Sequence, residues 1–97
     1  MAGGWLVGVL VEIDHAVPLR HFYAVAQDDQ ARAEWAAADR ALGAGVIASS
    51  PHGGVEPVEG MCRLSPAAIK SMGLAAGQVK ALGWKWPRRW LLLAGQA

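Results

Sequence analysis

The stretch that decides the fold is DDQARAEWAAADRAL, residues 28–42, whose pattern predicts an α-helix. Asp28 is the expected N-cap, because its carboxylate accepts amide protons that have no partner in the first turn, and it can also pair with Arg32. Apolar side chains recur at helical spacing and form one stripe: Ala31, Trp35, Ala38 and Leu42. Gly43 follows where a left-handed cap belongs. We therefore expect a helix over residues 28–42 whose Trp35 stripe is buried against a sheet.

Short β-prone segments flank this helix on both sides. Residues 5–13 and 21–26 precede it, and residues 46–49 and 58–64 follow it. Pro18 lies between the first two segments, and the loop SSPHGGVEP lies between the last two. A second helix is expected after Ser65-Pro66, a serine cap followed by proline, and should end at Gly73. The pattern predicts an α+β fold: two layers, a four-stranded, mainly antiparallel sheet in the order ββαββα, and both helices on one face.

Residues 65–82, SPAAIKSMGLAAGQVKAL, have apolar residues placed around a central glycine, with a further helical piece over 75–82. This segment resembles a helix-turn-helix unit, which would imply nucleic-acid binding. Gln78 and Lys80 are then the polar residues on the outer side of the second helix. The alternative is an ordinary helical hairpin that closes the core.

Charge is divided unevenly along the chain. Through Gly60 there are eight acidic and three basic residues, whereas from Met61 onward there are six basic residues and none that is acidic. Such a division favours either an acidic partner for the basic half or attraction between the two halves, within one molecule or between two copies.

The tail, residues 84–97, follows a single domain expected over residues 1–83. Its sequence, WKWPRRWLLLAGQA, interleaves aromatic and basic side chains: Trp84, Lys85, Trp86, Arg88, Arg89 and Trp90. Arginine pairs with carboxylate or phosphate, and tryptophan fills pockets or stacks on bases. The tail is thus predicted to bind a partner, unless its tryptophans cover the open face of the sheet.

Groups that could support catalysis or metal binding are few: His15, His21, His52 and Cys62. They show no spacing typical of a metal site, and no glycine-rich phosphate loop is present. A cysteine nucleophile would need a histidine brought close by the fold. We therefore expect a protein that is not an enzyme and that needs no metal or cofactor, with an enzyme or metal protein built on these four residues as the alternative.

The leading hypothesis is a small interaction module that binds an acidic protein, or a second copy of itself, through the tail. The first alternative is a nucleic-acid-binding protein that uses residues 65–82 and the tail. A single cysteine excludes an internal disulfide, and no apolar run reaches the ~20 residues of a membrane span. Together with the lack of a signal-peptide pattern, these features predict a cytoplasmic protein.

Overall fold

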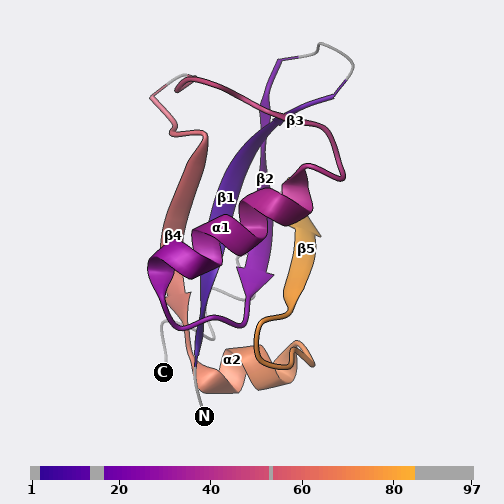
Figure 1. Ribbon diagram of the computed structural model, residues 1–97. Helices are drawn as coiled ribbons and strands as arrows, with labels where there is room; N and C mark the ends of the chain where they lie inside the picture. The colour runs from indigo at the N-terminus through magenta and orange to yellow at the C-terminus, as the bar shows by residue number, and fades with distance from the viewer. Residues whose placement is uncertain (1–2, 14–16, 53, 85–97) are drawn as a thin grey trace.

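The computed structural model of this 97-residue chain describes residues 3–13, 17–52 and 54–84. Seven elements follow one another (Figure 1): β1 (Gly4–Glu12), β2 (Leu19–Val25), α1 (Gln30–Ala41), β3 (Val46–Ile47), β4 (Val58–Leu64), α2 (Pro66–Ser71) and β5 (Val79–Gly83). The predicted α+β class and antiparallel sheet are confirmed. The predicted order and strand number are only roughly right, because a fifth strand follows the second helix.

The sheet is built around β1, which has neighbours on both sides. β2 pairs with it along almost its whole length, from Trp5 opposite Val25 to Val11 opposite Leu19. On the other side, β4 pairs with the first part of β1 and β3 with its last two residues. β5 then pairs with β2, and every pairing is antiparallel. β3 and β4 thus form one edge of the sheet, and β5 forms the other.

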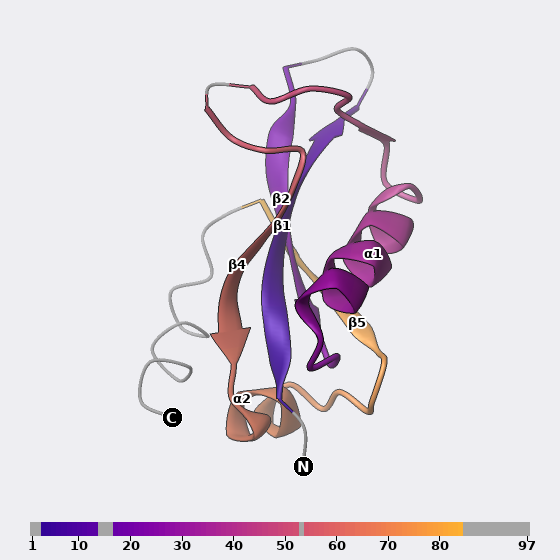
Figure 2. The ribbon, with the colours of Figure 1, turned by 60° about the vertical axis from the view of Figure 1, so that its left-hand side comes forward.

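Side chains of β1 alternate between two apolar layers. One layer joins the sheet to α1: Val7, Val9, Val11, Tyr23, Val25, Ala33, Ala37 and Ala41. The other joins the opposite face to α2: Leu6, Phe22, Ala24, Ala26, Leu64, Ala68, Ile69 and Met72. The prediction that both helices cover one face is therefore wrong. Figure 2 shows α1 on one side of the sheet and α2 at its end, toward the other side.

The position of α1 is close to the prediction, but its orientation is not. Asp29, rather than Asp28, caps the helix by accepting a hydrogen bond from the Arg32 amide at 2.9 Å. The buried residues are three alanines, whereas Trp35 is 78% exposed and Leu42 is 61% exposed. The face of the sheet under α1 already carries valines and a tyrosine, so alanine methyl groups are what allow the helix to approach it closely.

The start and the end of α2 are as predicted. The Ser65 hydroxyl accepts a hydrogen bond from the Ala68 amide at 3.1 Å, and Pro66 begins the helix. At its other end, the Gly73 amide donates to the Lys70 carbonyl and the Leu74 amide to the Ile69 carbonyl, the two bonds of a Schellman cap.

The helix predicted over residues 75–82 is wrong, because the chain turns there and enters β5. Gly77 has a φ of +81°, a left-handed value that a continuing helix does not allow. Its amide donates to the Ala26 carbonyl at 2.8 Å, and the Ala26 amide donates to the Gln78 carbonyl at 2.9 Å. These bonds hold the turn against the end of β2, from which β5 continues the sheet. The resemblance to a helix-turn-helix unit therefore fails at its second helix.

Candidate docking surface on α1

Trp35 is the most exposed of the large hydrophobic residues that the structure describes, and other apolar residues lie beside it. Together with apolar residues of α1, of its C-cap, of β3 and of β4, it forms what we call the Trp35 surface: Ala31, Trp35, Ala38, Leu42, Ile47 and Val58. A single exposed apolar residue is ordinary, but a contiguous apolar patch on a small domain is typical of an interaction site. The stripe that the sequence predicted for the core is thus the centre of an exposed surface.

The Trp35 surface is not flat. Trp35 and Ala38 line two shallow apolar grooves. One runs toward Val58 of β4, and the other runs toward Leu42 and Ile47 and has a volume of about 480 Å³. The tryptophan ring is therefore a projecting knob next to hollows in which a partner's side chain can fit.

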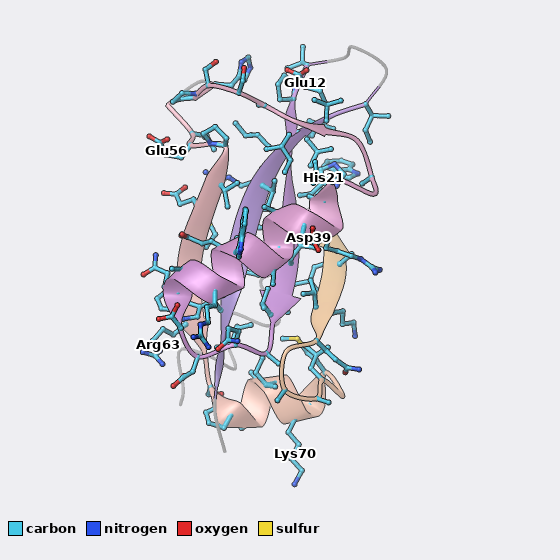
Figure 3. All side chains as sticks on the ribbon, in the orientation of Figure 1. Glu12, His21, Asp39, Glu56, Arg63 and Lys70 are labelled. Atoms are coloured by element: carbon cyan, nitrogen blue, oxygen red, sulfur yellow. The ribbon has the colours of Figure 1, made fainter. Side chains whose placement is uncertain are left out.

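Two opposite charges border the Trp35 surface. Arg32 and Asp39 are both exposed, and Asp39 projects from α1 in Figure 3. They lie seven residues apart, two helical turns, and so on the same flank of the helix. Within the part of the chain that the structure describes, neither side chain belongs to an ion pair.

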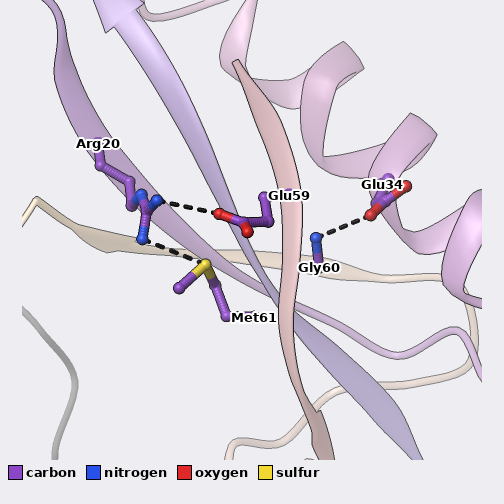
Figure 4. Close-up of polar contacts among 5 residues, drawn as sticks. All are labelled: Arg20, Glu34, Glu59, Gly60 and Met61. Carbon is purple, nitrogen blue, oxygen red and sulfur yellow. Dashed lines mark hydrogen bonds and ion pairs between the residues drawn. The ribbon is translucent and has the colours of Figure 1, made fainter. Parts of the chain in front are cut away.

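α1 is fixed to the outer strand β4 by a polar contact. Glu34 accepts a hydrogen bond from the Gly60 amide at 2.7 Å (Figure 4). A Cβ atom at Gly60 would lie 2.8 Å from Gln30 Nε2 and 3.1 Å from Glu34 Oε2, so a side chain there would displace this contact. Glycine at position 60 thus lets the helix satisfy a backbone donor of the sheet.

The segment that leads into α1 is held by a second group of contacts. The Trp5 indole donates to the Asp28 carbonyl at 2.9 Å, and Asp28 pairs with Arg63 at 2.6 Å. The Arg63 guanidinium also lies over the Trp5 ring, 5.5 Å from its centroid. Asp28 therefore joins the acidic and basic halves of the chain instead of pairing with Arg32 as predicted.

The opposite face of the sheet has its own polar contact. Arg20 on β2 reaches over Gly8 of β1 to Glu59 on β4, at 3.0 Å, and donates to the Met61 sulfur at 3.3 Å (Figure 4). The Arg20 side chain is only 22% exposed. Its charge is already paired, so this contact serves to join three strands rather than to attract a ligand.

Two of the candidate catalytic residues, His21 and Cys62, lie on opposite faces of the sheet. His21 pairs with Val9 and Cys62 with Leu6, and these two positions of β1 point to opposite faces of the sheet. His52 lies in an exposed loop, and His15 is outside the described residues. Burial raises the pKa of the Cys62 thiol above its ordinary value, which keeps the thiol protonated and less nucleophilic. No group of three potential metal ligands occurs among the described residues.

Tyr23 lies between the sheet and the end of α1. Burial raises the pKa of its phenol, and the nearby charge of Arg40 acts in the opposite direction. Both residues line a small hollow near Gly43, but the Tyr23 side chain as a whole is buried, which favours a structural role.

Of the residues predicted to form the tail site, the structure describes only Trp84. Trp84 is 57% exposed, and Lys85, Trp86, Arg88, Arg89 and Trp90 lie outside the described residues. Gln78 lies in the turn before β5, where its side chain accepts a hydrogen bond from the Ala75 amide at 2.8 Å. Lys80 lies on β5, in register with Ala24. The described helices include none that is both long and apolar enough to cross a bilayer.

Comparisons of the chain with protein families, with curated proteins and with solved structures give no match. The candidate site therefore depends on the chain's own geometry. Sequence reasoning did not identify Trp35 as a surface residue, nor Ile47 and Val58 as its neighbours. The signal that could have identified it is a second stripe in the same helix, Ala33, Ala37 and Ala41, which also recurs every four residues.

Proposed function

We propose that this protein is a small, non-enzymatic interaction module that docks another protein through the Trp35 surface. The observation that carries the proposal is the exposure of Trp35, 78%, on a helix that has small alanines available for its buried face. Leaving a tryptophan in water forgoes a burial that is worth several kcal/mol at a protein interface. Tryptophan is also the residue type most enriched among interface anchors.

Rigidity of α1 supports the same function. The helix is capped by Asp29 and attached to the outer strand through the Glu34–Gly60 contact. A surface that is already ordered loses little conformational entropy when a partner binds. The tail, with its tryptophans and arginines, is proposed as a second binding segment that begins at the exposed Trp84.

A photo-crosslinking experiment tests the proposal. Benzoylphenylalanine placed at position 35 should form a covalent adduct with a protein when the chain is irradiated in the cells that normally produce it. The matched control is the same group at Ala67, an exposed position of α2 on the other side of the sheet. An adduct at position 35 but not at position 67 is expected. Equal labelling at the two positions, or none at position 35, would contradict the proposal.

A further inference from the structure

We propose that the partner of the Trp35 surface is a second copy of this chain, joined through α1 of each copy about a two-fold axis, with the two helices antiparallel. This inference rests on the function proposed above, and it names the partner and the register. Two features of the surface carry it: the sizes of the residues in the stripe, and the signs of the two charges on its flank.

The first feature is the alternation of large and small residues. Along the stripe the order is Ala31, Trp35, Ala38 and Leu42, with spacings of four, three and four residues, as in a short coiled-coil seam. In an antiparallel pair, Trp35 lies opposite the partner's Ala38, and Leu42 lies opposite the partner's Ala31. Each layer then contains one large and one small side chain, and each knob meets a hollow. A parallel pair would instead place tryptophan against tryptophan and leave a gap between alanines.

The second feature is the pair of charges. Arg32 and Asp39 lie on one flank of α1, and a perpendicular two-fold axis places that flank against the same flank of the partner. In the register fixed by the stripe, Arg32 lies within about two residues, roughly 3 Å along the axis, of the partner's Asp39. Because of the two-fold symmetry, the contact between Arg32 and the partner's Asp39 forms twice in the dimer. Among the described residues, no other ion pair competes for either side chain.

The position of α1 in the fold leaves room for this pairing. α1 is the outermost layer on its side of the sheet (Figure 2), so a second α1 can lie against it without meeting the sheet. The 12-residue helix is about 18 Å long. A contact of this length is smaller than a standard interface, which buries roughly 800 Å² per partner. We therefore expect a weak dimer, with a dissociation constant on the order of 10 µM.

Sedimentation equilibrium of the full chain over a range of concentrations tests the inference. The wild type should be a dimer at high concentration and a monomer at low concentration. Trp35→Glu should be monomeric throughout; should that variant fail to fold, Leu42→Glu serves the same purpose, because Leu42 is 61% exposed. Arg32→Glu and Asp39→Arg should each weaken the dimer by about tenfold, since each change replaces two attractions with two repulsions. Combining the two changes should restore the constant to within about threefold of the wild type.

Lys70→Glu is the matched control, because it makes the same charge change as Arg32→Glu on α2 and should leave the dimer intact. A dimer that survives Trp35→Glu would overturn the inference but not the proposed function, which the photo-crosslink from position 35 tests separately. A dimer that Trp35→Glu abolishes but the combined charge exchange does not restore would overturn the antiparallel register. A wild type that stays monomeric at about 1 mM would overturn self-pairing. In that case, a photo-crosslink from position 35 to a protein of another mass would still support the proposed function.

Discussion

The two sides of α1 differ in a way that hydrophobicity alone does not explain. Its buried side consists of Ala33, Ala37 and Ala41, whereas its exposed side carries Trp35 and Leu42. The larger and more apolar residues are thus the ones in water. The space between helix and sheet decides which side of α1 is buried, because the valines of β1 already fill that layer. The exposed side is the one that we propose as the docking surface.

The largest expected effect is on the buried side. Ala37→Leu introduces three carbon atoms where the residue is fully buried and should lower the free energy of unfolding by about 3 kcal/mol. Urea denaturation followed by circular dichroism measures the change. Ala38→Leu, one position along and partly exposed, is the matched control and should cost less than about 1 kcal/mol. Similar costs at the two positions would show that the sides of α1 are not distinguished by packing.

A smaller effect is expected at the boundary between the two sides, where Glu34 contacts β4. Glu34→Ala removes the acceptor of the Gly60 amide and should cost about 1–2 kcal/mol. Glu34→Gln keeps an oxygen at the same reach and should recover at least half of that loss. Hydrogen exchange at the Gly60 amide reports the contact itself, and unchanged protection in Glu34→Ala would refute its role.

On the exposed side the expected change in stability is smaller still. Trp35→Ala should alter the free energy of unfolding of the dilute monomer by less than about 0.5 kcal/mol, because little area is lost from the core. Had the sequence-based orientation been right, the same change would cost about 3–5 kcal/mol. Measurement at low concentration keeps the stability of the monomer separate from that of any dimer.

The smallest expected effect is on the pH dependence of stability. It comes from Cys62, which is desolvated on the other face of the sheet. Its raised pKa means that the folded chain holds the thiol proton more firmly than the unfolded chain does. The contribution of the protonated Cys62 thiol to the free energy of unfolding is therefore complete below the ordinary thiol pKa of 9.0. It declines as the pH rises above that value. Cys62→Ser should flatten the alkaline part of a stability–pH profile slightly. At neutral pH, alkylation of Cys62 should be slower in the folded chain than in urea, and equal rates would contradict its desolvation.

Much of the fold could be predicted from local signals. The alternation in β1, the β-branched and aromatic residues of β2 and the Ser65-Pro66 start of α2 each have a direct physical meaning, and each was found close to its expected place. β5 could not be predicted in this way. Val79 to Gly83 follows Ala75-Ala76, two residues that favour a helix, and what makes it a strand is the exposed edge of β2 together with the turn at Gly77.

The candidate site was harder to predict for a related reason. Periodicity in residues 28–42 shows that the helix is apolar on more than one side, but it does not say which side meets the sheet. Which side of the helix meets the sheet depends on residues of β1 and β2 that are distant in sequence. The predicted tail site has a different status: apart from Trp84, it lies outside the described residues and stays a prediction.

The fluorescence of Trp35 shows whether this residue lies on an exposed docking surface. Subtracting the spectrum of Trp35→Phe from that of the wild type isolates the emission of this one tryptophan. At high dilution we predict emission like that of free tryptophan in water, with full access to acrylamide. At high concentration, emission should shift to shorter wavelength and access should fall. Short-wavelength emission protected from acrylamide at high dilution would place Trp35 in the core and contradict the account.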